Sequence, residues 1–389
     1  MAAAVAVAQR GGKPTVFEAG PVPGGRARRV SSQGTELDNG QHILIGAYSA
    51  LYDMMRTVGV PENALLRMPL EVRYARGFSF RRLWLPEPFG LAGGLLTASG
   101  VPLAERIRAA RFFQSLKSMN FRLPQDVPVA ALLEREKQNG RLAHYLWRPL
   151  CISALNTPPE LASANVFLAV LRDTLAGAPE ASDLLLPRVD LSRLFPEPAA
   201  EFVRARGGDL RLQSPVKDLG ALRQGFDRVI VAVGPHQLKT LVPDAPEYDY
   251  QPIYTCYLQY GEGVRLPFPM LGLADGLVQW VFDRGRLLGE KGRLACVISA
   301  QGDHQQLSHE EIAERCQREL ASARLISEKP QWSRVIAEKR ATITCAPGAK
   351  RLPQIAGVAV AGDYTDPEYP PTLEAAVRSG IRAAHAVLH

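Results

Sequence analysis

The apolar positions at the front of the chain predict a helix followed directly by a strand. Residues 2–10 (AAAVAVAQR) are mostly alanine and valine and predict a helix, and Gly11-Gly12 stands where glycine commonly ends one. Thr15-Val16-Phe17 then predicts a buried strand that ends at Glu18. In a βαβ unit, an acidic residue at the end of the second strand binds the ribose hydroxyls of a dinucleotide, so Glu18 is a candidate ligand.

The end of the chain shows a strand followed by a helix. Residues 358–360 (VAV) predict a short strand that leads into Gly362 and Asp363, and after a Pro-rich turn Thr372 is placed to cap an Ala-rich helix that begins with Glu374-Ala375. A helix start has unpaired N–H groups and a partial positive charge, which suit a phosphate or a flavin carbonyl. The Asp363 carboxylate can accept from a ribityl or ribose hydroxyl. This arrangement is typical of the closing segment of FAD enzymes and predicts flavin redox chemistry.

A glycine turn near the front offers a place for a pyrophosphate. Gly24, Gly25 and Arg26 form a turn in which the backbone can approach a ligand closely beside a cation. The phosphate-binding Gly-x-Gly-x-x-Gly that should lie about 20 residues before Glu18 does not occur in this chain. We therefore expect the natural protein to begin upstream of Met1, or this form to bind its coenzyme poorly.

The chain alternates between two kinds of pattern. Continuous apolar runs such as residues 228–233, together with a predicted strand over 210–216, are typical of a parallel sheet covered on both faces. Residues 250–340 instead predict an antiparallel sheet, with a helix over 309–323 capped by Ser308. The prediction is an α/β fold in which a Rossmann-like FAD-binding domain is interleaved with a mixed α+β substrate domain. The FAD-binding domain is assigned to residues 1–65, 195–245 and 341–389, and the substrate domain to residues 66–194 and 246–340.

The net charge and the cysteines indicate which partners and which compartment to expect for this protein. The net charge is +7 over 389 residues, and arginines gather between Arg73 and Arg122 among apolar residues. A nucleic-acid-binding protein would show a concentrated basic face with interleaved aromatic residues, so we expect no nucleic acid partner. The arginines suit an anionic membrane surface, or they form an ordinary solvated surface. Five cysteines without a C-x-x-C pair, and no visible secretory signal, predict a cytoplasmic protein without a metal site.

Residues 103–119 predict an amphipathic helix. Its apolar stripe comprises Leu103, Ile107, Ala110, Phe113 and Leu116, with arginines beside it. Such a helix either packs its stripe on the protein core or lies in a membrane surface. The second alternative predicts a peripheral contact with the cytoplasmic face of the membrane.

Longer strings carry a family resemblance across nearly the whole chain. They are Leu37-Asp38-Asn39-Gly40-Gln41-His42, Trp147-Arg148-Pro149-Leu150-Cys151, Leu155-Asn156-Thr157-Pro158-Pro159, Ser182-Asp183-Leu184-Leu185-Leu186-Pro187-Arg188-Val189-Asp190, Phe195-Pro196-Glu197-Pro198, Glu338-Lys339-Arg340-Ala341-Thr342 and the closing Gly362-Asp363 with its helix. The chain resembles the flavin monoamine oxidase and phytoene desaturase superfamily, and most closely its squalene-associated branch, the hydroxysqualene dehydroxylases of bacterial hopanoid synthesis. It departs from their pattern in the missing glycine loop and in Ala375, where glycine is expected.

This resemblance implies reductive loss of the hydroxyl group of hydroxysqualene to give squalene, with FAD as coenzyme and reduced FAD as hydride donor. The hydroxyl is on an allylic carbon, so its departure leaves a delocalised cation. A general acid helps, because water is a better leaving group than hydroxide. The resemblance also implies a long isoprenoid substrate and upstream squalene-pathway synthases as partners.

The resemblance places further residues near the coenzyme and the reacting carbon. The motif around Gly40 passes the flavin, and Val216 is a backbone contact on the adenine side or a plain core residue. His42 is either the proton donor to the leaving hydroxyl or a core histidine bonded to a carbonyl, and Asp38 and Asp183 are alternative acids.

Two other functions stay open on the sequence alone. An oxidative desaturase of the phytoene type would transfer hydride in the opposite direction. A coenzyme-free lipid-binding protein would explain the missing glycine loop, and it would purify without flavin absorbance.

Overall fold

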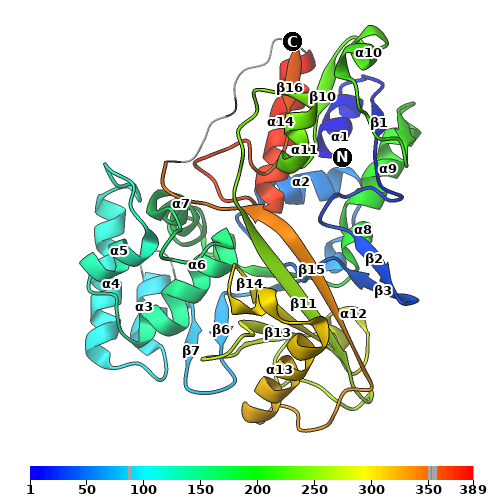
Figure 1. Cartoon of the computed structure of the whole chain (residues 1–389). Coiled ribbons are helices and arrows are strands. Elements are labelled where there is room, and N and C mark those ends of the chain that lie inside the picture. Colours follow the sequence, from blue (N-terminus) through cyan, green and yellow to red (C-terminus); the bar gives the residue numbers. More distant parts are fainter. Residues whose placement is uncertain (86–88, 349–351, 353–356, 389) are drawn as a thin grey trace.

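The two ends of the chain lie together, on the far side of the molecule from a large antiparallel sheet. The structure, a computed structural model, describes residues 1–85, 89–348, 352 and 357–388. In Figure 1 the chain ends are at the top, the antiparallel sheet is at the bottom, and a group of helices lies on the left. Two long strands, β11 (Tyr250–Gln259) and β15 (Trp332–Ile343), run from the upper part into the sheet. The mixture of helices with parallel and antiparallel strands agrees with the predicted α/β class.

The upper part contains two pairs of parallel strands. β1 (Thr15–Phe17) pairs with β9 (Asp209–Arg211), and β10 (Val229–Val231) pairs with β16 (Val358–Val360). The helices around them are α1 (Ala2–Gln9), α2 (Ser49–Thr57), α8 (Leu191–Leu194), α9 (Pro196–Ala205), α10 (Leu219–Gln224), α11 (Pro235–Leu241) and α14 (Leu373–Leu388). The predicted front helix and both predicted terminal strands are confirmed. The expected segment upstream of Met1 concerns residues outside this chain and stays a prediction.

The first and last helices pack closely against each other. Gly11, with φ +82°, ends α1, and the Gly12 N–H bonds to the Val7 carbonyl at 3.1 Å. A β-carbon on Gly380 of α14 would lie 2.9 Å from the Ala3 nitrogen of α1, so this position requires glycine for the two helices to approach. Buried side chains from Val5, Val203 and Val377 join these helices in one apolar core.

The strand predicted over 210–216 is shorter than expected. It spans only Asp209–Arg211, because Gln213 takes a left-handed φ of +51° and turns the chain. The Gln213 N–H then bonds to the Gly20 carbonyl at 3.0 Å. Val216 consequently lies in a loop rather than in a strand, and its side chain is half-buried.

The lower part is a five-stranded antiparallel sheet. Its order is β12-β13-β14-β11-β15, where β12 spans Met270–Gly272, β13 Trp280–Asp283 and β14 Arg293–Ser299. The helix α12 (Arg284–Leu288) follows β13, and α13 (His309–Ser322) packs on one face of the sheet. The Ser308 Oγ accepts from the Glu311 N–H at 3.2 Å, which confirms the predicted cap of α13.

The remaining elements are further helices and small sheets. The helices of the helical region are α3 (Phe89–Thr97), α4 (Leu103–Ser118), α5 (Val129–Arg135), α6 (Arg148–Leu155) and α7 (Ala164–Leu175), with a π-helix at Ala143–Trp147. Single helical turns occur at Glu62–Ala64, Pro179–Ser182 and Asp303–Gln306. The small sheets are β2 (Arg29–Ser32) with β3 (Thr35–Asp38), which lie beside α8, then β4 (Leu44–Ile45) and β5 (Leu65–Met68) on either side of β8 (Leu184–Pro187), and β6 (Glu71–Arg73) with β7 (Ser79–Arg81).

Asn156 joins the helical region to the sheet. It ends α6 in the left-handed conformation, with φ +46°. Its side-chain amide donates to the Gln251 and Pro252 carbonyls at 3.3 Å each and to the Thr342 hydroxyl at 3.0 Å, and its oxygen accepts from the Ala300 N–H at 2.8 Å. A buried amide with four partners fixes the position of α6 relative to three segments of the sheet domain.

The apolar stripe predicted for residues 103–119 is partly wrong. The helix α4 exists, and Phe113 and Leu116 are buried as predicted, but Ala109 and Phe112 complete the buried face. Leu103 and Ile107 point outward instead, with 63% and 37% of their surface exposed. The helix therefore carries a second, exposed apolar group at its first two turns.

Candidate functional site

The glycine turn and the closing motif meet in space. Gly24 and Gly25 have φ values of +119° and +59°, which only glycine adopts readily. They turn the chain so that the Arg26 guanidinium lies 2.7 Å from the Asp363 carboxylate and also donates to the Ala341 carbonyl. Candidate residues from the two ends of the sequence therefore form one site.

The closing motif is held by its own helix. A β-carbon on Gly362 would lie 2.2 Å from the Tyr364 ring, and the Gly362 N–H donates to the Ser379 hydroxyl of α14 at 2.9 Å. The Thr372 Oγ accepts from the Ala375 N–H at 3.2 Å, which confirms the predicted cap. This packing fixes Asp363, which is 8% exposed, beside α14.

Glu18 stands at the end of β1, as predicted. One carboxylate oxygen accepts from the Gly20 N–H at 2.6 Å and shapes the following turn. The Glu18 carbonyl accepts from the Ser214 N–H at 2.9 Å, and this bond holds the loop after β9 next to the end of β1. The second carboxylate oxygen has no protein donor among the described residues, so it can accept from a ribose hydroxyl.

Two guanidinium groups make this part of the site electropositive. Burial lowers the pKa of His236, and Arg340 and Arg26 lower it further. Burial raises the pKa of Tyr250, while the same two arginines oppose that rise. A turn of left-handed glycines, two cations and an acidic hydroxyl acceptor fit the phosphates and sugar of a flavin coenzyme.

The segment that follows β3 contacts the antiparallel sheet through a buried ion pair. Asp38 accepts from the Leu191 N–H at 2.8 Å through one oxygen, and from the Arg284 guanidinium at 3.1 Å through the other. Both ionic side chains are nearly inaccessible, with 5% and 1% of the side chain exposed. Burial raises the pKa of Asp38, whereas Arg284 lowers it. Both Asp38 oxygens therefore have protein partners, and its predicted catalytic role stays a prediction.

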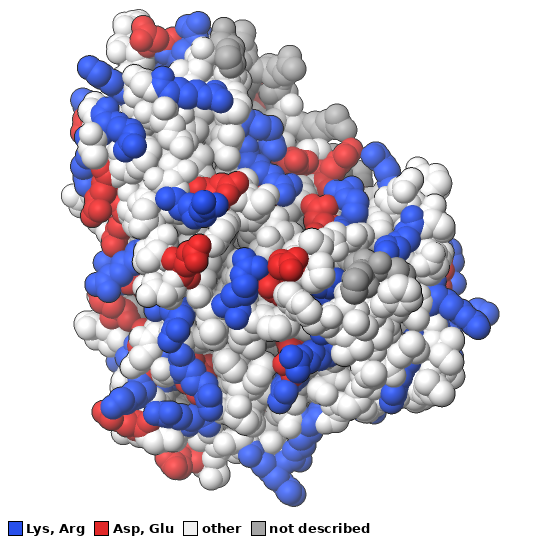
Figure 2. Space-filling model, turned by 180° about the vertical axis from the view of Figure 1, so that it is seen from behind, with Lys and Arg blue, Asp and Glu red and all other residues white. Residues whose placement is uncertain are grey.

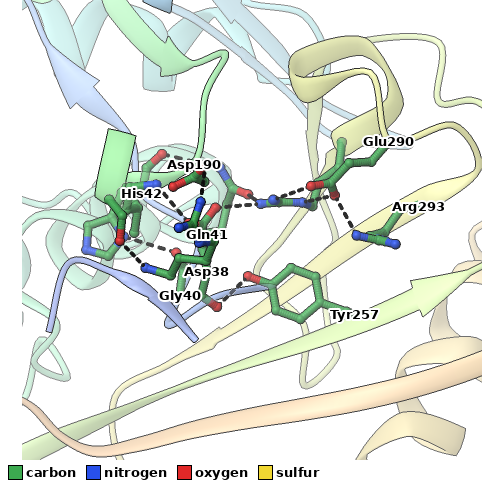
Figure 3. Close-up of polar contacts among 12 residues, drawn as sticks. Asp38, Gly40, Gln41, His42, Asp190, Tyr257, Glu290 and Arg293 are labelled. Carbon is green, nitrogen blue, oxygen red and sulfur yellow. Dashed lines mark hydrogen bonds and ion pairs between the residues drawn. The ribbon is translucent and has the colours of Figure 1, made fainter. Parts of the chain in front are cut away.

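The ion pair belongs to a longer chain of contacts, shown in Figure 3. Arg284 also binds Glu290 with N–O distances of 2.6 and 2.9 Å, and Glu290 binds Arg293 at 3.1 Å. The Tyr257 hydroxyl donates to the Asp38 carbonyl at 2.9 Å. Sequence reasoning missed Arg284, although its place directly after the wholly buried strand β13 was a signal. This network fixes the motif around Gly40 against the sheet.

His42 lies at the end of this motif. Its Nδ1 is 3.1 Å from the Gly40 carbonyl, and because a carbonyl only accepts, Nδ1 carries a hydrogen. Burial lowers the pKa of His42, so the neutral ring with a free lone pair on Nε2 is favoured near neutral pH. To protonate a leaving hydroxyl, Nε2 first has to take up a proton, which becomes easier as pH falls toward the lowered pKa. The ring is both carbonyl-bonded and able to carry a proton, so the two alternatives for His42 are compatible.

Two predicted site residues have other partners in the structure, and a third has no polar side chain. Asp183 pairs with Arg67 at 3.1 Å, and burial raises the pKa of Asp183 while Arg67 opposes it. Glu374 is fully buried and accepts from the Ala50 and Leu51 N–H groups at 3.1 and 2.8 Å, so it caps the start of α2. The alkyl side chain of Val216 cannot form a hydrogen bond. Its predicted backbone contact on the adenine side stays a prediction. The carboxylates of Asp183 and Glu374 are used for packing of the fold.

The sequence profile described as flavin containing amine oxidoreductase matches residues 1–388. The chain belongs to this family. Within it, the chain is 30% identical to a hydroxysqualene dehydroxylase of Rhodopseudomonas palustris, over 100% of this chain and 96% of the relative. It is 28% identical to one of Sinorhizobium fredii, over 100% of this chain and 95% of the relative. These matches confirm the resemblance found in the sequence, and this flavin containing amine oxidoreductase is an enzyme that uses a flavin.

Solved structures of similar fold agree with this assignment. A putative protoporphyrinogen oxidase from Exiguobacterium superposes with a TM-score of 0.70 at 16% identity, covering 99% of this chain and 96% of that one. Cyclohexylamine oxidase from Brevibacterium oxydans superposes with a TM-score of 0.67 at 16% identity, covering 100% and 95%. The predicted α/β fold of the amine oxidase type is thereby confirmed.

Proposed function

We propose that this flavin oxidoreductase binds FAD and reductively removes the hydroxyl group of hydroxysqualene to give squalene. The observation that carries the proposal is the contact between the Gly24–Arg26 turn and Asp363. The motif around Gly40, which leads to His42, lies directly beside this contact and faces the apolar side of the sheet. The whole-length similarity to hydroxysqualene dehydroxylases supports the choice of substrate.

The residues of the chain suit this reaction. A reduced flavin, when bound, would supply the hydride that the allylic cation accepts. The sheet face and helical region around Tyr257, Phe282 and Val297 form one apolar core, which would exclude water from a cation that water would otherwise capture. His42, with Nδ1 fixed on the Gly40 carbonyl, presents Nε2 as a site that can hold the proton for the leaving oxygen.

The proposed function is tested by mixing photoreduced enzyme with hydroxysqualene without oxygen. We expect flavin absorbance to return as one squalene forms per flavin. A phytoene-type desaturase would instead have its oxidised flavin bleached by a saturated isoprenoid; one relative, a probable zeta-carotene desaturase of Synechococcus elongatus, is 22% identical. A protein that stays colourless after incubation with free FAD would be the coenzyme-free lipid-binding alternative.

We further propose that the enzyme works in the cytoplasm, docked on the membrane. Exposed large apolar side chains gather on α3, α4 and the loop before them, and we call this set the α3–α4 apolar patch: Trp84, Leu85, Phe89, Leu96, Leu103 and Ile107. The Leu83 N–H bonds to the Gly90 carbonyl and Arg106 bonds to the Leu96 carbonyl, so the three segments are neighbours. Among the described helices, none is long and apolar enough to cross a bilayer.

Charge favours an anionic lipid surface as the partner of this patch. Arg81, the last residue of β7, and Arg108 and Arg111 of α4 form no ion pair with any residue that the structure describes. The helical side of the molecule, on the right in Figure 2, is largely uncharged with scattered Lys and Arg. Apolar insertion combined with unpaired cations is the usual composition of a peripheral membrane contact. An oily substrate would then reach the enzyme directly from the bilayer.

Changing Phe89 and Leu103 together to serine is expected to weaken binding to vesicles with anionic headgroups by at least about tenfold. Each substitution removes an apolar side chain whose transfer from water into lipid is favourable by roughly 1–2 kcal/mol. Vesicle flotation measures the bound fraction. Leu161→Ser removes an exposed leucine of 41% accessibility outside the patch and should change nothing. Equal flotation of the double variant and wild type would reject this surface, and equal binding to neutral vesicles would reject the role of the arginines.

A further inference from the structure

Thr255 lies at the centre of the antiparallel sheet, on the face that looks toward the Gly40 motif. It belongs to β11, the strand between β14 and β15. Side chains alternate along a strand, so Thr255 shares its face with Tyr257, whose hydroxyl reaches the Asp38 carbonyl. Figure 3 shows Tyr257 pointing from the sheet toward Asp38 and Gly40. The Thr255 side chain therefore faces the region where the coenzyme and substrate domains meet.

The Thr255 hydroxyl has no hydrogen-bond partner among the described residues. The residue is completely buried, and its Oγ1 is inaccessible to solvent. Its neighbours in the sheet register, Val297 and Ile336, offer no polar side chain. Because a buried hydroxyl without a partner costs stability, valine would be the more stable residue for packing alone.

The missing side chain of Gly40 leaves room beside this hydroxyl. A β-carbon placed on Gly40 would lie 3.8 Å from the Thr255 Oγ1 and 3.8 Å from the His42 Cε1, and would meet nothing closer. Glycine at this position therefore leaves a gap of at most about one methyl group between a threonine hydroxyl and a histidine ring. Tyr257 and Val297, which share the face of the sheet with Thr255, belong to the main apolar core. Two polar groups converging on a small space in an apolar surrounding are typical of the part of a binding site that fixes ligand orientation.

We propose that the Thr255 hydroxyl binds the oxygen atom of the alcohol substrate, opposite His42. This inference rests on the proposed function and extends it to the choice between substrate and product. An alcohol completes the hydrogen bond of Thr255, whereas the hydrocarbon product leaves that hydroxyl unpaired again. The pairing therefore favours binding of the alcohol and release of the hydrocarbon.

Thr255→Val tests this role, because it replaces the hydroxyl by a methyl group of similar size. Equilibrium binding of hydroxysqualene and of squalene is measured with oxidised holoenzyme, which cannot deliver hydride, from changes in flavin absorbance. We expect the preference for the alcohol over the hydrocarbon to fall by about tenfold, the effect of losing one hydrogen bond. The melting temperature should be equal or higher, and flavin content should be unchanged. Thr255→Ser keeps the hydroxyl and should keep the preference.

Tyr260→Phe is the matched control. The Tyr260 hydroxyl is also buried without a partner, but it belongs to the core on the opposite face of the sheet. Its removal should leave the binding preference unchanged. If wild type prefers the alcohol and Thr255→Val keeps that preference, the assignment of Thr255 is wrong. If wild type itself binds the two isoprenoids equally and reduced enzyme forms no squalene, the proposed function fails instead.

Discussion

Replacing Arg284 by methionine is expected to lower the free energy of unfolding by about 3–5 kcal/mol. Arg284 is buried and compensates Asp38 on one side and Glu290 on the other. Without it, the Asp38 carboxylate keeps only the Leu191 N–H as a donor among the described residues and is left as an uncompensated charge in an apolar region. Urea denaturation followed by circular dichroism measures the loss.

Two further variants separate charge from packing. Adding Asp38→Asn to Arg284→Met removes the stranded charge and should restore part of the loss. Lys291→Met breaks an ion pair with Glu262 in which both side chains are exposed, by 61% and 78%, and should cost less than about 1 kcal/mol. A loss for Arg284→Met as small as that of Lys291→Met would show that the buried network does not stabilise the junction between the two parts of the chain.

Replacing Asp363 by alanine is expected to weaken flavin binding by about 10- to 100-fold, the effect of losing one charge-assisted hydrogen bond. Asp363 stands at the strand end before α14 and is held beside Arg26. Its loss removes the acceptor for a coenzyme hydroxyl and leaves the Arg26 guanidinium without its carboxylate. Titration of apoprotein with FAD, followed by flavin fluorescence, measures the dissociation constant.

Asp366→Ala is the matched control, because Asp366 is a nearby carboxylate that lies 3.9 Å from Arg382 and accepts from the Glu368 N–H at 3.1 Å. It should leave flavin affinity unchanged. Parallel titration with FMN distinguishes the coenzymes: FAD should bind more tightly, since Glu18 would meet the ribose that FMN lacks. Equal affinities of wild type and Asp363→Ala for FAD would contradict the assignment of this site.

Local signals in the sequence were sufficient to predict where three helices begin or end. Gly11 marks the end of α1, and the Ser308 and Thr372 caps mark the starts of α13 and α14, because each signal acts within one turn of backbone. The sequence assigned Arg26 and Asp363 to one FAD-binding domain, although it did not predict the contact between them. These parts of the fold and of the candidate site were accessible from residue order alone.

Contacts between distant segments were not accessible in this way. The partner of Asp38 is Arg284, 246 residues later, and no local pattern relates the two. The helical periodicity of α4 was read correctly, but which apolar residues face the core depends on the elements that pack on the helix, and Leu103 and Ile107 are exposed. The Thr255 hydroxyl was missed for the same reason, since an unpaired group is recognised only after all its neighbours are known.

The close packing of α1 against α14 has a consequence for biosynthesis. The ribosome releases α1 long before it makes α14, so the side of α1 that Gly380 contacts stays uncovered until α14 has been synthesised. Gly380 and Asp363 arrive only at the end, and contacts between such distant positions form slowly. Capture of the coenzyme is therefore an event that follows translation, and a chaperone that shields the nascent amino-terminal segment would raise the yield of yellow protein.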